Sequence, residues 1–168
     1  LSGCPNALRN TPHYSFITPN PCDLGHDAPC VDKSTGGLAQ IDGFLLKWVP
    51  QILASPAYQA DGVLIITFDE ASGPPGKDSS ACCGEKGMPG SRNPPGGDGP
   101  GGGVTGAVVL SPFVTPGTIS DVPYNHYSTL RWIEDQFGVP HLGYAAAKGL
   151  VTFGEDVFVP PKRAHALT

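Results

Sequence analysis

The stretch DGVLIITFDEASGPPG, residues 61–76, sets the first expectation for the fold. Within it, residues 63–68 are apolar or β-branched throughout, without the alternation of a half-exposed strand. Such runs are typical of strands that are buried on both faces of a parallel sheet. The run passes directly into Asp69 and Glu70 and then breaks at glycine and proline, so two carboxylates stand where the strand ends.

Adjacent carboxylates repel each other unless a cation, a proton or hydrogen-bond donors compensate the charge. A bound divalent metal ion is therefore one explanation for Asp69 and Glu70. The other is that Asp69 caps the turn that follows while Glu70 is solvated. The pair alone does not decide between these two interpretations.

Length, composition and charge limit the class of protein. The 168 residues, 39% of them hydrophobic, suit one domain of ordinary size. The net charge of −5 comes with no cluster of Lys and Arg, which argues against a nucleic-acid partner. No apolar run approaches the roughly 18 to 20 residues of a membrane span, so no stable membrane insertion is expected. Small-molecule partners are favoured.

Strand and helix patterns alternate along the chain. Residues 14–18 are β-prone, and from Gly37 apolar residues recur at three- and four-residue steps, which predicts an amphipathic helix that Pro50 kinks or ends. Residues 106–110 form a second buried-strand pattern. The alternation predicts an α/β layered domain with a mostly parallel sheet, in which ligands bind beyond the carboxyl ends of the strands.

The last ordered element is a helix that Asn125 or Ser128 can cap and that Gly138 ends. Between the two later strands, residues 71–103 are about half Gly and Pro, too poor in large apolar groups to form a layer. They predict a long loop that shapes access to a site, because loops of this length in compact domains are usually functional.

The five cysteines do not form the Cys-x-x-Cys pairs of a zinc site, so disulfides are favoured. Cys22 and Cys30 enclose a short polar loop that a disulfide would rigidify, which points to a secreted or extracytoplasmic location. Cys82 and Cys83 join each other or reach elsewhere. For Cys4, a partner upstream and a free buried thiol both remain open.

Two further groups of polar residues follow predicted elements. The loop NPCDLGHDAPC, residues 20–30, carries Asp23, His26 and Asp27, although taken alone it is better explained as a turn with incidental charges. His126 opens a helix, where it can ligate metal or donate to an anion, although a histidine taken alone is more often a capping or core residue. If these groups meet Asp69 and Glu70 at one sheet edge, they form an oxygen and nitrogen site suited to Zn, Mn, Mg or Ca.

Four motifs follow one another along the chain: FITPNPCDLGHD (16–27), LLKWVPQILASPAYQADGVLIITFDE (45–70), GAVVLSPFVTPGT (106–118) and YNHYSTLRWIEDQFGVPHLGY (124–144). In this order and spacing they resemble the C-terminal half of the bacterial phosphoesterase family, which includes secreted acid phosphatases, a phosphatidylinositol-3-phosphatase and phospholipases C. The resemblance covers about residues 12–158 and implies that residues 1–168 are the C-terminal part of a single phosphoesterase domain with an alkaline-phosphatase-like α/β/α sandwich.

The resemblance also implies a site. Asp69 and Glu70 match the family's paired acidic metal ligands. Asp23, His26 and Asp27 match a loop that supplies a further ligand and phosphate contacts. His126 matches a histidine that binds metal or phosphate. We accordingly expect Asp23 and Asp27 to hold a divalent metal ion with the first pair, and His26 and His126 to act in catalysis.

The same resemblance predicts metal-dependent hydrolysis of small-molecule or lipid phosphate esters, as in an acid phosphatase. Family members carry their Ser or Thr nucleophile upstream of these motifs, so the chain resembles a fragment that needs a missing N-terminal segment of the same protein and is poorly active alone. A phospholipase C-type phosphodiesterase and a non-catalytic secreted domain stabilised by metal are the alternatives.

Overall fold

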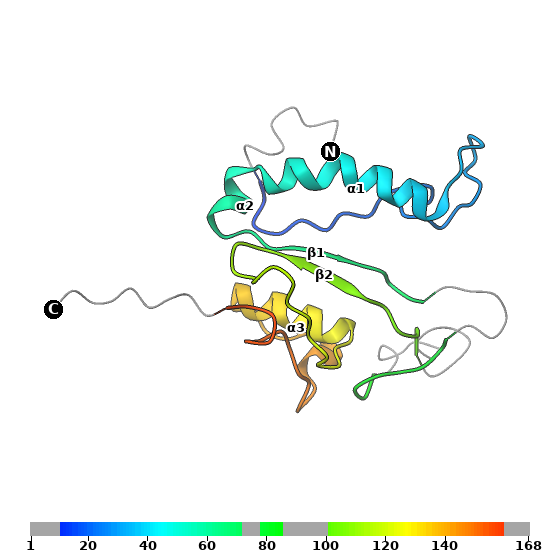
Figure 1. Cartoon of the computed structure of the whole chain (residues 1–168). Coiled ribbons are helices and arrows are strands. Elements are labelled where there is room, and N and C mark those ends of the chain that lie inside the picture. Colours follow the sequence, from blue (N-terminus) through cyan, green and yellow to red (C-terminus); the bar gives the residue numbers. More distant parts are fainter. Residues whose placement is uncertain (1–10, 72–77, 86–100, 160–168) are drawn as a thin grey trace. The chain divides into compact units, whose positions relative to one another are not determined.

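The computed structural model describes residues 11–71, 78–85 and 101–159. It divides the chain into two compact units, Leu1–Gly62 and Val63–Thr168, whose elements are labelled in Figure 1. The expectation for Cys4 and most of the expected loop at 71–103 lie outside the described residues.

The first unit contains two helices, α1 (Gly37–Leu53) and α2 (Pro56–Asp61). The helix predicted from Gly37 is confirmed, but it does not end at Pro50. It continues to Leu53, and the Ala54 amide donates to the Pro50 carbonyl at 3.0 Å. Proline removes the amide donor at its own position and its ring crowds the carbonyl four residues earlier, but its carbonyl still accepts, so the helix continues for three residues beyond Pro50. Ser55 then caps α2 by accepting from the Tyr58 amide at 3.3 Å.

The predicted strand at 14–18 is wrong: these residues have no regular structure. Tyr14 is 50% exposed and Phe16 82% exposed, so the side chains do not pack as those of a core strand. A β-prone run becomes a strand only when another strand pairs with it, and β propensity depends on that context.

The second unit contains a two-stranded sheet, in which β1 (Leu64–Thr67) pairs with β2 (Ala107–Leu110). Both strands are predicted, but the expected parallel arrangement is wrong here, because the two strands run antiparallel with Leu64 opposite Leu110 and Thr67 opposite Ala107. Parallel neighbours need a crossover connection, usually a helix. In the antiparallel pair, β2 begins beside the end of β1, so the connection starts and finishes at the same end of the sheet.

The helix α3 (His126–Phe137) forms as predicted. Both proposed capping residues take part, since the Asn125 side chain accepts from the Ser128 amide at 3.1 Å and the Ser128 hydroxyl accepts from the Asn125 amide at 3.2 Å. This reciprocal pair is a capping box. Gly138 ends the helix with a φ of 60°, a left-handed conformation that glycine adopts without a steric penalty.

Aromatic rings hold the segment after α3 against that helix. Phe153 is buried and packs edge-on against Tyr124, with ring centroids 4.9 Å apart, and it also contacts Trp132. Trp132 in turn stacks on Phe158 at 5.1 Å. The short 3₁₀ helix η1 (Gly143–Ala146) lies within the same segment and contacts α3. The segment from 139 to 158 therefore folds back and packs against α3.

Asp156 anchors this cluster by accepting hydrogen bonds from the Tyr124 hydroxyl at 2.6 Å and from the Ser120 hydroxyl. Partial burial opposes ionisation of Asp156, but these bonds and one from the Gly154 amide outweigh it and lower its pKa. Burial, together with the hydrogen bond and the charge of Asp156, raises the pKa of Tyr124 to about 12.

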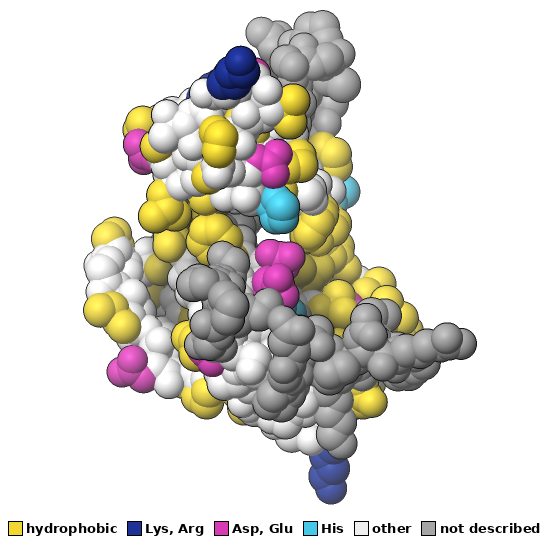
Figure 2. Space-filling model, turned by 90° about the vertical axis from the view of Figure 1, so that its right-hand side faces the viewer, with side chains coloured by type: hydrophobic (Ala, Val, Ile, Leu, Met, Phe, Trp, Pro, Cys, Tyr) yellow, Lys and Arg dark blue, Asp and Glu magenta, His cyan; other side chains and the backbone are white. Residues whose placement is uncertain are grey.

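Many large apolar side chains remain exposed, as the yellow surface in Figure 2 shows. Val108 of β2 is 54% exposed and Leu46 of α1 is 68% exposed. A two-stranded sheet covers too little surface to be stable by itself and needs other elements to pack on it. The described residues of the second unit thus contain a strand pair and α3, but not a complete α/β/α sandwich. No helix among the residues described is long and apolar enough to cross a membrane.

The Cys22–Cys30 disulfide is present, as predicted, with the two Cα atoms 5.3 Å apart. Replacing both cysteines by alanine should lower the free energy of unfolding by about 2 to 3 kcal/mol, because the bond closes a short loop. Urea denaturation measures this loss. Val31→Ala is the matched control, since Val31 directly follows Cys30, is 95% exposed and should change little. Equal midpoints for all three proteins would contradict a stabilising disulfide.

Titration of Tyr124 provides a second test. The phenol should ionise near pH 12 in the native protein, and the Asp156→Asn variant should bring that value down toward 10.0. The phenolate absorbance of the wild type minus that of Tyr124→Phe isolates this group. Because the native pKa is raised, the stability that Tyr124 contributes is complete below about pH 10 and is lost as the pH rises toward 12. An ordinary tyrosine titration would contradict the Asp156 contact.

Candidate functional site

Asp69 and Glu70 follow the end of β1 after one intervening residue, Phe68, and both are exposed. Among the described residues, no side chain donates a hydrogen bond to either carboxylate. The main chain around them is nevertheless fixed, because the Ala71 amide donates to the Gly102 carbonyl at 2.8 Å and the Thr67 hydroxyl donates to the Gly106 carbonyl at 3.0 Å. The turn after β1 therefore holds two carboxylates in place and leaves their oxygens available.

His126 lies beside this turn. Its Nε2 is 2.8 Å from the carbonyl oxygen of Asp69, although the two residues are 57 positions apart in the chain. A carbonyl oxygen only accepts, so Nε2 carries the proton in this contact, and Nδ1 of a neutral ring then has the free lone pair. The His126 ring is exposed and joins the first turn of α3 to the end of β1. This contact brings together two of the three groups that the sequence singles out.

A second segment, residues 78–85, lies against residues 101–104, which lead into β2. The Gly101 and Gly103 amides donate to the carbonyls of Ser79 and Ser80, each at 3.0 Å. Gly103 has a φ of 80°, and a Cβ there would lie 2.4 Å from the Asp78 carbonyl oxygen, so only glycine fits. Both ends of the Gly/Pro-rich connection are thus bonded to each other, beside the Ala71 to Gly102 contact.

Asp78 holds this arrangement by its side chain, which accepts from the Ser80 and Val104 amides, each at 2.9 Å. Hydrogen bonds from Ser80 and Val104 lower the pKa of Asp78. Sequence reasoning missed this residue. The signal was present, since Asp followed two positions later by Ser is the pattern of an Asx turn.

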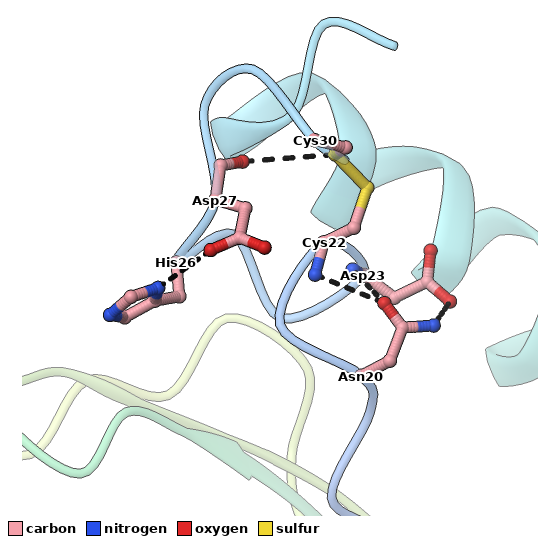
Figure 3. A network of polar contacts seen from close by, with 6 residues as sticks. All are labelled: Asn20, Cys22, Asp23, His26, Asp27 and Cys30. Carbon is pink, nitrogen blue, oxygen red and sulfur yellow. Dashed lines mark hydrogen bonds and ion pairs between the residues drawn. A yellow bond between two sulfur atoms is a disulfide. The ribbon is translucent and has the colours of Figure 1, made fainter. Parts of the chain in front are cut away.

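In the first unit, the disulfide loop forms its own network, shown in Figure 3. The Asn20 side chain accepts from the Cys22 and Asp23 amides and donates to the Asp23 carboxylate at 2.8 Å. Gln40 of α1, which the sequence did not single out, donates to the same carboxylate at 2.8 Å. Two neutral side chains therefore donate to the Asp23 carboxylate. These bonds position the loop, and they occupy oxygens that a cation would otherwise use.

His26 and Asp27 form a separate pair. The His26 Nδ1 is 2.9 Å from the Asp27 carboxylate, and the His26 side chain is 78% exposed. The Asp27 carbonyl accepts from the Gly37 amide at 3.2 Å, so the main chain of the loop caps the first turn of α1. A surface ion pair of this kind adds little stability, since water screens it, but it orients the imidazole.

The described residues of each unit form no cluster of three or more His, Cys, Asp or Glu side chains that would hold a metal ion. Asp69 and Glu70 still fit part of such a site, because hard divalent cations prefer carboxylate oxygens and these oxygens have no competing donor among the described residues. The expected union of Asp23, His26 and Asp27 with Asp69 and Glu70 is a relation between the two units and stays a prediction.

Comparison with known proteins gives one match. No curated protein and no solved structure matches the chain. The pattern of the Phosphoesterase family matches residues 6–140, which include the disulfide loop, both strands and all of α3. This match implies an alkaline-phosphatase-like fold and hydrolysis of phosphoric esters, in a family that is in general metal-dependent. Because the match spans most of the 168 residues, the chain belongs to the Phosphoesterase family.

Proposed function

We propose that this chain supplies the metal-binding half of a phosphomonoesterase site of the acid phosphatase type. The observation that carries the proposal is the turn after β1, where Asp69 and Glu70 stand adjacent, exposed and without donors among the described residues, while main-chain bonds hold the turn in place. Two such carboxylates in a member of a phosphoester-hydrolysing family are best explained as metal ligands.

Asp69 and Glu70 would hold the divalent ion, which when bound stabilises negative charge on a phosphoryl group. His126 would keep the turn in position through its Nε2 proton and present Nδ1 to the ion or to a phosphate oxygen. His26, oriented by Asp27, would donate to phosphate from the disulfide loop, and Asp23 and Asp27 would complete the ligand set. The proposal takes the nucleophile from sequence outside the 168 residues.

The disulfides support an extracytoplasmic site of action, since such bonds persist in oxidising compartments. The Gly/Pro-rich connection begins next to Glu70, so it would border the substrate and influence which esters fit. The substrate would be a small-molecule or lipid phosphate ester.

The activity test compares the full-length protein with its Asp69→Asn/Glu70→Gln variant. We expect hydrolysis of p-nitrophenyl phosphate that depends on added Zn, Mn, Mg or Ca, and a loss of about 100-fold or more in the variant, since charge stabilisation of this kind is worth that much. Glu155→Gln is the matched control, because Glu155 is an exposed carboxylate in the same unit and has no part in the proposed site.

Comparing monoester and diester substrates in this assay distinguishes the phosphomonoesterase from the two alternative functions. Faster turnover of bis(p-nitrophenyl) phosphate than of the monoester would establish a phosphodiesterase of the phospholipase C type instead. Metal that raises the melting temperature without any turnover of either ester would establish a non-catalytic domain. Full activity of the Asp69→Asn/Glu70→Gln variant would show that Asp69 and Glu70 are not metal ligands of the site.

A second prediction concerns His126. His126→Ala should lower metal-dependent activity about 10- to 100-fold, as is usual when a group that orients metal ligands is lost. His126→Gln retains an N–H donor for the Asp69 carbonyl and should recover part of that loss if the role is positioning. The apparent dissociation constant for Mn²⁺ is the second readout. Identical behaviour of the Ala and Gln variants would show that the ring, not the hydrogen bond, matters.

A further inference from the structure

Cys82 and Cys83 are neighbours in the chain and are joined to each other. Cys83 is exposed and Cys82 is half-buried, so a small reagent can reach the pair. They belong to residues 78–85, a segment that is bonded through Asp78 and the Ser79 and Ser80 carbonyls to residues 101–104, which lead into β2. Neither cysteine has a role in the proposed hydrolysis.

The two sulfur atoms face the chain immediately before α3. The Cys83 Sγ lies 3.1 Å from the Pro123 carbonyl oxygen, and the Cys82 Sγ lies 3.5 Å from the Tyr124 carbonyl oxygen. As thiols, both side chains can donate a hydrogen bond to these oxygens. As a disulfide, neither has a proton to donate. The number of hydrogen bonds between residues 78–85 and the chain immediately before α3 therefore depends on the redox state of the pair.

These contacts close a ring around the proposed site. The Tyr124 carbonyl directly precedes Asn125, the residue that caps α3, and His126 follows it and bonds to Asp69. On the other side, residues 78–85 are bonded to 101–104, and the Gly102 carbonyl accepts from Ala71, next to Glu70. A change in the bonding of the cysteines can thus affect the turn that carries both carboxylates through His126 and also through residues 101–104.

The geometry points to a redox-sensitive cysteine pair at Cys82 and Cys83 that sets how firmly the N-terminus of α3, and with it His126, is held against the end of β1. A dithiol reductant is the reaction partner. The S–S bond breaks, each sulfur gains one electron and one proton, and the reductant becomes a disulfide. The reduced pair then donates to the Pro123 and Tyr124 carbonyls, and the oxidised pair does not.

The effect on activity rests on the proposed function, but the effect on α3 does not. Amide hydrogen exchange separates the two, because it needs neither substrate nor metal. The Ser128 and Thr129 amides, which donate to Asn125, report on the first turn of α3. In the full-length protein, reduction should slow their exchange about fivefold, the effect of roughly one neutral hydrogen bond.

Two variants of the pair give matched controls. Cys82→Ser/Cys83→Ser keeps two hydroxyl donors and should exchange slowly, like the reduced wild type. Cys82→Ala/Cys83→Ala has no donors and should exchange quickly, like the oxidised wild type. Neither variant should respond to the dithiol at these two amides, so any remaining response of the Ala variant measures reduction of the Cys22–Cys30 disulfide.

Three results would overturn the inference. The first is alkylation of Cys82 and Cys83 in protein that was never reduced, since no disulfide would then exist. The second is unchanged Ser128 and Thr129 exchange after mass spectrometry shows that the bond has been cleaved. The third is equal exchange in the Ser and Ala variants. If exchange responds as expected while phosphate ester hydrolysis is absent, the cysteine pair stands and the proposed function fails.

Discussion

The antiparallel pairing of β1 with β2 is the constraint on which the second unit depends. It places the start of β2 beside the end of β1, so the connection between them leaves and returns at the same end of the sheet. Described parts of that connection are then bonded to each other: the Ala71 amide donates to the Gly102 carbonyl, and the Val104 amide donates to the Asp78 carboxylate. A parallel pair would have carried the chain to the opposite end and left the turn at Asp69 without these neighbours.

Main-chain contacts hold the candidate site, and this explains why its acidic side chains remain available. The turn is held by two hydrogen bonds to main-chain carbonyls, one from the Ala71 amide to Gly102 and one from His126 to Asp69. The carboxylates of Asp69 and Glu70 accept no hydrogen bond from the described residues. In the disulfide loop the division is different. There the Asp23 carboxylate is occupied by Asn20 and Gln40, so recruiting it to a metal ion would cost those two bonds.

Local features were predictable from the sequence, and non-local ones were not. The capping box at Asn125, the end of α3 at Gly138 and the short-range Cys22–Cys30 bond each depend on residues close in the chain. Strand direction depends on a partner about 40 positions away, which is why the parallel arrangement was wrong and why residues 14–18 gave a false strand. The contact of His126 with Asp69 likewise joins residues 57 positions apart, so neither the sequence around Asp69 nor that around His126 predicts it. Family resemblance, by contrast, identified the chain correctly because four ordered motifs carry it.

The central claim is that the turn after β1 binds a divalent ion between Asp69 and Glu70. Paramagnetic broadening by Mn²⁺ tests it most directly, because a bound Mn²⁺ ion weakens the NMR signals of nearby amides whether or not the protein turns over a substrate. The account predicts that substoichiometric Mn²⁺ broadens the Ala71 and Gly102 amides and the His126 ring first, and that Mg²⁺ reverses the effect. Broadening that begins elsewhere and leaves these three groups sharp would contradict it.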